Sequence, residues 1–123
     1  MARVLIVDDS SFMRKKVAQI LEKGGHTVVG QACDGSEGFD AYKRYSPDFV
    51  VMDVTMRGMD GISAARLILS RDSQARVIMM SMISDPDVIQ RAKEVGIAGF
   101  VSKDSLDRIT AIMEDMETQG VTA

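Results

Sequence analysis

Polar side chains capable of chemistry follow four short apolar runs of this chain. They are Asp8 and Asp9 after residues 4–7, Asp53 after 49–52, Ser81 after 77–80 and Lys103 after 99–102. If these runs are strands of an open parallel sheet, their carboxyl ends share one edge, where ligands bind in such folds. Like charges about 4 Å apart repel by about 4 kcal/mol at an effective dielectric constant of about 20, so converging carboxylates need a cation. A hard divalent ion such as Mg²⁺, which pairs carboxylates with phosphate oxygens, suits this set.

The elements that must position these residues alternate regularly. Apolar runs and segments of helical periodicity alternate five times, which predicts a doubly wound α/β fold with a parallel five-stranded sheet. The expected strands are Val4–Val7, Val28–Cys33, Phe49–Met52, Val77–Met80 and Gly99–Ser102. Apolar residues at helical spacing mark the expected buried helix faces: Met13, Val17, Ile20, Leu21, Phe39, Tyr42, Ile62, Ala65, Leu69, Val88, Ala92, Val95, Ile109, Ile112, Met113 and Met116.

Two helix starts carry recognisable capping residues. Ser10-Ser11 predicts the beginning of the first helix, because a hydroxyl at the N-cap accepts from a free backbone N–H. Pro86 fits the first turn of the fourth helix, with Ser84 or Asp85 as its cap.

Length and composition indicate a single intracellular domain. We expect one domain over residues 1–123, ordered from about 2 to 118, with a short polar tail and no output domain. A net charge of −3 argues against nucleic acid as a direct partner, because binding a phosphate backbone needs a basic surface. No apolar stretch is long enough to span a membrane, so we expect a cytoplasmic protein. Cys33 is expected to be a buried or half-buried thiol, and His26 an exposed side chain in a turn.

The same residues resemble the family of response-regulator receiver domains. The resemblance rests on Val-Asp-Asp-Ser at 7–10, Asp53, Met59-Asp60-Gly61, Ser81 and Lys103, and it covers essentially the whole chain in order. Met52-Asp53-Val54-Thr55-Met56 and the length make the chain most similar to single-domain chemotaxis regulators of the CheY type. The resemblance implies a flavodoxin-like fold of five βα units with strand order 2-1-3-4-5, the order known for CheY.

The resemblance also implies a role for each residue of the predicted site. Asp53 would accept a phosphoryl group from a sensor histidine kinase or a phosphotransfer domain. Asp8, Asp9, Asp53 and the main-chain carbonyl of Thr55 would hold Mg²⁺, or Mn²⁺ in its place, with Asp8 acting largely through water. Lys103 would pair with a phosphoryl oxygen. The protein would then be a phosphorelay switch, not an enzyme that turns over an external substrate.

A second group of residues is implied in switching and output. Ser81 would contact another phosphoryl oxygen, and Phe100 would swing inward when Ser81 moves. A downstream protein would bind the face formed by the fourth helix, the fifth strand and the fifth helix. On the fourth helix, Ile89 lies beside the expected buried stripe and Lys93 outside it, so both are candidates for that face. Met82 directly follows Ser81, at the mouth of the predicted site.

The chain departs from the family pattern at three positions. Met82 replaces a small residue, so its side chain is expected to gate access to Asp53, with Ile83 as a further apolar screen. Arg57 replaces a proline, which predicts a less restrained loop after Asp53. Asp104 replaces another proline, and we expect the peptide bond that precedes it to be trans, because a cis bond before a residue other than proline is costly.

Three other functions fit parts of the pattern. A phosphohydrolase with an aspartate nucleophile needs a second acid two residues further on, where this chain has Thr55. A flavin or nucleotide binder needs free N–H groups after the first strand, where this chain has two carboxylates. A receiver-like scaffold without phosphorylation is the third alternative, favoured by Met82 and Asp104 and tested by phosphoryl transfer to Asp53.

Overall fold

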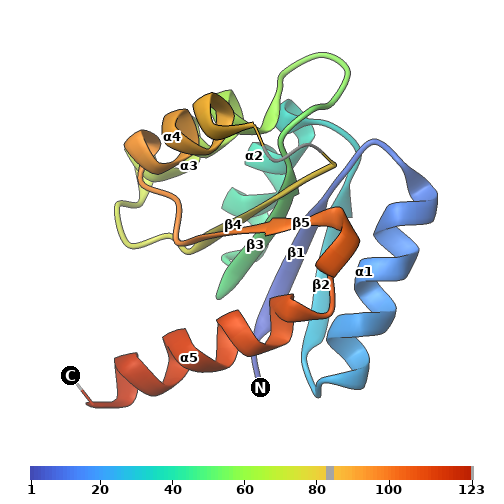
Figure 1. Cartoon of the computed structure of the whole chain (residues 1–123), viewed down its shortest axis with the longest axis vertical. Coiled ribbons are helices and arrows are strands. Elements are labelled where there is room, and N and C mark those ends of the chain that lie inside the picture. The colour runs from blue at the N-terminus through green and yellow to red at the C-terminus, as the bar shows by residue number, and fades with distance from the viewer. Residues whose placement is uncertain (83–84, 123) are drawn as a thin grey trace.

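Five parallel strands form one sheet with helices on both faces (Figure 1). The structure is a computed structural model that describes residues 1–82 and 85–122, with side chains described as far as Thr118. The strands are β1 (Arg3–Val7), β2 (Thr27–Ala32), β3 (Phe49–Asp53), β4 (Val77–Ser81) and β5 (Gly99–Ser102). The helices are α1 (Ser11–Lys23), α2 (Gly35–Tyr45), α3 (Gly61–Arg71), α4 (Pro86–Val95), the short 3₁₀ helix η1 (Lys103–Ser105) and α5 (Arg108–Thr122).

The strand order is β2-β1-β3-β4-β5, which confirms the predicted fold class and topology. Every expected strand lies within one residue of its predicted bounds. The last helix differs from expectation, because α5 continues to Thr122 where a polar tail was expected after Thr118. The segment has no proline to interrupt the helix, and α5 continues through Gly120.

The two faces of the sheet have separate cores. In Figure 1, α1 and α5 cover one face, and α2, α3 and α4 cover the other. Because successive strand residues point to opposite faces, Leu5 and Val7 of β1 pack toward α2–α4 and Val4 and Ile6 toward α1 and α5. Ile68 of α3 is fully buried, one position before the predicted Leu69, which is only partly buried. Ile62, Ala65 and Ile68 are three residues apart, so they lie on the same face of the helix.

Parallel pairing brings the ends of the strands to one edge. The register sets Asp53 of β3 opposite Met80 of β4, and Ser81 opposite Ser102 of β5. Asp8 extends the pairing of β1, because its N–H donates to the Ala32 carbonyl at 3.0 Å. The polar residues singled out in the sequence therefore lie along this carboxyl edge.

Four helices begin at this edge with side-chain caps. In each, the cap accepts from a backbone N–H of the first turn: Ser10 from Met13, Asp34 from Glu37, Asp60 from Ser63 and Asp85 from Asp87. Asp85 is thus the cap of α4, with Pro86 in the first turn as predicted. Ser84, the other candidate cap, and Ile83 lie outside the described residues. Each cap therefore sets the residue at which a loop from the preceding strand ends and a helix begins.

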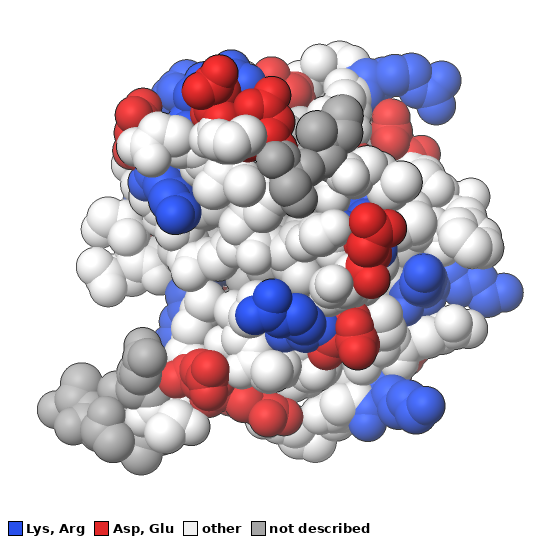
Figure 2. Space-filling view, in the orientation of Figure 1, with Lys and Arg blue, Asp and Glu red and all other residues white. Residues whose placement is uncertain are grey.

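The surface carries charges of both signs. Figure 2 shows acidic and basic side chains interspersed over the face in view, in keeping with the net charge of −3. Among residues 1–82 and 85–122, no helix has the length and apolar character that crossing a membrane would require.

His26 is buried, contrary to the prediction of an exposed turn residue. The N–H of Ala2 donates to its Nδ1 at 3.0 Å. The neighbouring Thr27 N–H donates to the Ala2 carbonyl at 2.8 Å, so the start of β2 lies against the N-terminal segment. The imidazole is therefore covered by chain that precedes β1, and it supplies an acceptor for a backbone N–H.

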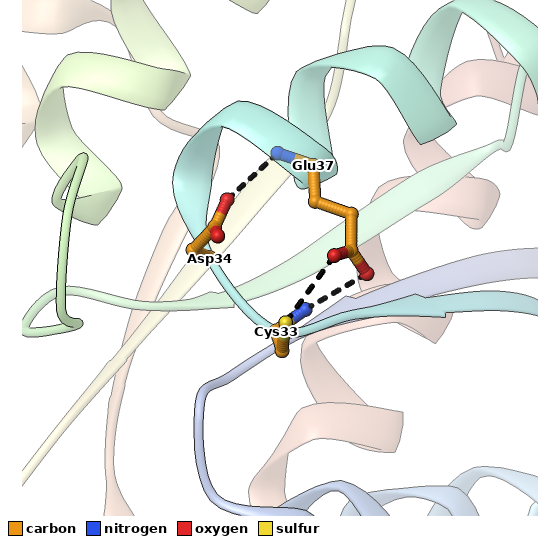
Figure 3. A group of neighbouring side chains, drawn as sticks. All are labelled: Cys33, Asp34 and Glu37. Carbon is orange, nitrogen blue, oxygen red and sulfur yellow. Dashed lines mark hydrogen bonds between the residues drawn. The ribbon is translucent and has the colours of Figure 1, made fainter.

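Cys33 is exposed, where burial or half-burial was expected. β2 ends at Ala32 and is an edge strand of the sheet, so Cys33 lies just beyond the covered surface. Figure 3 shows Glu37 reaching back from α2 to this residue, and the thiol donates to Glu37 Oε2 at 3.2 Å. This hydrogen bond, with the neighbouring negative charge, raises the pKa of the Cys33 thiol and favours its protonated form.

Candidate functional site

The carboxyl edge of the sheet holds a small cavity beside Asp53. Its volume is about 290 Å³, and it is lined by Asp53, Thr55, Ser81, Met82 and Lys103. These residues come from the ends of β3, β4 and β5, segments that the parallel register brings together. The predicted acceptor, hydroxyl and lysine thus share one concave site.

Lys103 is a buried cation between two carboxylates. Its Nζ lies 2.9 Å from Asp8 Oδ2 and 3.3 Å from Asp53 Oδ2. The side chain of Lys103 is 6% exposed and that of Asp8 is fully buried. A buried ammonium requires such partners, because desolvation without compensation would favour its neutral form. Lys103 therefore ties the ends of β5 and β1 together at the cavity.

Asp8 is held on several sides. Its Oδ1 accepts from the Ser10 N–H at 2.9 Å, while its Oδ2 accepts from Lys103. The guanidinium of Arg14, one turn into α1, donates to the Asp8 main-chain carbonyl at 2.7 Å. The position of Asp8 is consequently fixed by β1, α1 and β5 together.

The three acids are close enough to share one cation. Ligand atoms from Asp8, Asp9 and Asp53 all lie within 4.8 Å of one another. Lys103 offsets one of the three negative charges, and oxygen donors of this kind match the preference of hard divalent ions. The residues present thus fit a divalent metal ion by both charge and donor type.

The pKa of Asp53 is raised above its ordinary value. Burial is the largest cause, and the neighbouring negative charge of Asp8 raises the pKa further. The Lys103 ammonium and a hydrogen bond from the backbone of Thr55 oppose these effects. A cation beside Asp53 would favour the ionised carboxylate, which is the nucleophilic form.

Asp9 lies nearer to solvent than the other two acids and contacts the loop after β3. Its Oδ2 accepts from the backbone N–H of Arg57 at 3.2 Å, and the Arg57 Nε lies 3.8 Å from the same oxygen. The sequence predicted a less restrained loop because Arg57 replaces a proline. The structure instead gives this position a hydrogen bond that proline has no N–H to make.

Gly61 closes the loop tightly against β3. Its N–H donates to the Val54 carbonyl at 2.8 Å, and a Cβ at this position would collide with the main-chain carbonyl of Asp53. Gly58, three residues earlier, has a φ of +74°, which favours glycine. The sequence motif Met59-Asp60-Gly61 therefore combines a helix cap with a close backbone approach.

The remaining predicted residues lie around the cavity and along α4. Met82 is 67% exposed at the cavity mouth. Phe100 is half-buried and packs against the core beneath α2–α4. Ile89 is half-buried and Lys93 exposed on α4. The peptide bond between Lys103 and Asp104 is trans, as expected.

Sequence reasoning missed two functional contacts of the site. The anchoring of the Asp8 carbonyl by Arg14 joins residues six apart, across a strand–helix turn. The pairing of Arg57 with Asp9 joins residues 48 apart. The only sequence signal for the second contact was the replacement of proline by a residue that has an N–H.

Comparisons with known proteins agree with this geometry. The family model described as response regulator receiver domain matches residues 4–114. The chain is 44% identical over 101 residues to the chemotaxis protein CheY of Bacillus subtilis, covering 82% of this chain and 84% of CheY. It is 43% identical over 103 residues to protein CcdB of the same organism, covering 84% of this chain and 86% of CcdB.

A solved structure shows the same likeness in three dimensions. The crystal structure of the CheX-CheY-BeF3-Mg²⁺ complex from Borrelia burgdorferi matches with a TM-score of 0.84 and 36% identity, over 94% of this chain and 87% of that chain. The chain belongs to the response regulator receiver family. It is a CheY-like phosphorelay switch, a signalling phosphoacceptor and not a turnover enzyme.

Proposed function

We propose that Asp53 is the residue that accepts the phosphoryl group, in a reaction that depends on Mg²⁺. Asp8, Asp9, Asp53 and the main-chain carbonyl of Thr55 would hold the ion, and Mn²⁺ would substitute for it. The observation that carries this proposal is the convergence of three carboxylates within 4.8 Å beside a buried lysine. Asp53 is the one of the three that lines the cavity.

The transfer takes place in one displacement. An oxygen of Asp53 forms a bond to phosphorus as the bond from phosphorus to an imidazole nitrogen of the donor breaks. The electron pair of the broken bond stays on the imidazole, which takes up a proton. The cation, when bound, offsets the charges of the acids and of the phosphoryl oxygens, which otherwise repel the nucleophile.

Lys103 and Ser81 position the transferred group. The Lys103 ammonium is already 3.3 Å from Asp53 Oδ2, so a phosphoryl oxygen on Asp53 lies within its reach. Lysine suits this contact because its ammonium is a compact point charge. The Ser81 hydroxyl lines the same cavity and donates to a second phosphoryl oxygen.

The partners follow from this chemistry. A sensor histidine kinase or a phosphotransfer domain supplies the phosphoryl group. Phosphorylation favours an inward arrangement of Ser81 and Phe100, and a downstream protein that prefers this state binds the face formed by α4, β5 and α5. Ile89 and Lys93 belong to that face.

Phosphorylation by acetyl phosphate tests the proposal without a kinase. The wild type, Asp53→Asn and the control Asp40→Asn are incubated with acetyl phosphate and Mg²⁺ or excess chelator, and intact mass is read. Asp40 is an exposed acid of α2 outside the site. We expect one added phosphoryl group in the wild type and the control, only with Mg²⁺, and none in Asp53→Asn. Labelling of Asp53→Asn, or equal labelling in chelator, would contradict the proposal.

A further inference from the structure

We infer that Arg57 is the resident counter-ion of Asp9 and competes with the divalent cation for that carboxylate. Arg57 thereby lowers the affinity of the site for Mg²⁺. The inference rests on the proposed function, because it concerns the same metal site.

The contact between Arg57 and Asp9 uses a single oxygen. Both the backbone N–H of Arg57, at 3.2 Å, and its Nε, at 3.8 Å, approach Oδ2 of Asp9. The three acids of the site are close enough to share one ion, so a cation bound among them draws on the same Asp9 carboxylate. Arg57 and the metal therefore act on one group.

A comparison of Arg57 with Lys103 shows why a bound metal ion would displace the Arg57 side chain and not Lys103. Lys103 pairs with both Asp8 and Asp53 and is buried, so moving it would leave two acids without their cation. Arg57 pairs with Asp9 from a side chain that is 91% exposed. A guanidinium at that exposure returns to water readily when the metal binds.

The size of the effect follows from the exposure of the pair. Ion pairs between exposed side chains change an equilibrium by about 1.4- to 5-fold. Removing the guanidinium should therefore strengthen Mg²⁺ binding by about 1.4- to fivefold at low ionic strength. Added salt should reduce the difference, because it screens exposed charges.

Mg²⁺ titration calorimetry compares Arg57→Ala with the wild type and with Arg44→Ala. Arg44 is an exposed residue in the last turn of α2, at the end of that helix away from the site, and its loss changes the net charge equally. We expect tighter Mg²⁺ binding in Arg57→Ala and no more than a small change in Arg44→Ala. Equal affinities of Arg57→Ala and the wild type would overturn the inference.

A double-mutant cycle separates competition at Asp9 from general repulsion between Arg57 and the metal. In an Asp9→Asn background, the gain from Arg57→Ala should shrink to that of Arg44→Ala, because the shared carboxylate is gone. A gain that persists undiminished would show that Arg57 acts only through its long-range charge, and would overturn the inference.

Thermal unfolding gives a readout independent of calorimetry. In chelator, Arg57→Ala should melt slightly below the wild type, because Asp9 has lost its counter-ion. The rise in Tm on adding Mg²⁺ should correspondingly be larger in the variant. Equal rises in both proteins would contradict the competition.

If the wild type binds no Mg²⁺ at all, the proposed metal site itself fails and the inference fails with it. Binding by the wild type with no effect of Arg57→Ala rejects the inference alone.

Discussion

At the scale of single residues, Asp53 is a carboxyl whose neighbours shift its pKa in opposite directions. Burial and Asp8 raise its pKa, while Lys103 and the Thr55 backbone lower it, and the rise prevails. The charged form of Asp53 is therefore less favourable in the folded protein than in the unfolded chain. The carboxylate that the proposed chemistry needs is one that destabilises the fold.

This balance predicts a pH-dependent gain from neutralising Asp53. A group with a raised folded-state pKa supports folding below its ordinary pKa, near 3.8, and loses that contribution as the pH rises through the raised value. In chelator, Asp53→Asn should therefore melt a few degrees above the wild type at neutral pH. The gap should close as the pH falls below the ordinary pKa of Asp53. Differential scanning calorimetry across pH, with Asp40→Asn as control, measures this, and equal Tm values at neutral pH would contradict it.

Met82 supports a prediction about access to the site. Its side chain stands at the cavity mouth and is 67% exposed, so it has freedom to change rotamer. Met82→Ala should raise both the rate of phosphorylation by acetyl phosphate and the rate of hydrolysis, because both need an approach to Asp53. Measured rates that stay within about twofold of the wild type would mean that the side chain does not gate the site.

At the scale of elements, α2 and α3 are joined away from the site by one hydrogen bond. The Tyr42 hydroxyl donates to Asp72 Oδ2 at 2.7 Å. This contact is the main reason that the pKa of Asp72 lies below its ordinary value. Burial is the main reason that the pKa of the Tyr42 hydroxyl is raised, and it stays protonated at neutral pH.

Tyr42→Phe tests that connection. A carboxyl with a lowered folded-state pKa stabilises the fold above its ordinary pKa, and this contribution is lost as the pH falls through the lowered value. The variant should melt below the wild type at neutral pH, with the difference shrinking in acid. A difference in Tm that is constant across pH would assign the loss to packing and not to the hydrogen bond.

The α4–β5–α5 face carries a prediction about switching. Hydrogen exchange of backbone amides, read with and without acetyl phosphate and Mg²⁺, should change most in α4, β5 and α5, around Ile89, Lys93 and Phe100. Lys93→Glu should leave phosphorylation of Asp53 unaltered, because Lys93 is exposed on α4 and does not line the cavity. Changes confined to α1 would place the output surface elsewhere, and equal changes in Asp53→Asn would show that phosphorylation of Asp53 does not cause them.

The local pattern of apolar and polar residues predicted the strands and helices well, and contacts between distant segments account for what it missed. Strand ends could be placed to within a residue, because each apolar run is followed by a polar or charged residue. His26 was misplaced because its burial depends on Ala2, 24 residues earlier. Cys33 was misplaced because an apolar run does not reveal where an edge strand stops being covered. Arg57 was assigned no partner, because a loop residue gives no periodicity from which to infer Asp9.

At the scale of the whole molecule, the site is a product of global folding. Its acids and lysine come from β1, β3 and β5 and meet only when the sheet is complete. Any ion that binds this arrangement stabilises the folded state over the unfolded one. The wild type should accordingly have a higher Tm in millimolar Mg²⁺ than in chelator. At a free Mg²⁺ concentration about tenfold above Kd, the free energy of unfolding should rise by about 1.4 kcal/mol. An unchanged Tm at concentrations that saturate binding would contradict the coupling.

The hydrogen bond between Lys103 and Asp8 joins residues 95 positions apart in a chain of 123 residues. During synthesis the amino-terminal segments leave the ribosome first, so Asp8, Asp9 and Asp53 are all present before Lys103 is made. Until β5 joins the sheet, the nascent chain has Asp53 and the other two acids without their buried cation. Lys103 is thus synthesised after the acids, and it links the chemistry proposed for Asp53 to the completion of the sheet. A chain that still lacks β5 and α5 therefore also lacks the lysine that the proposed transfer needs, so the proposed site and the proposed output face are completed together.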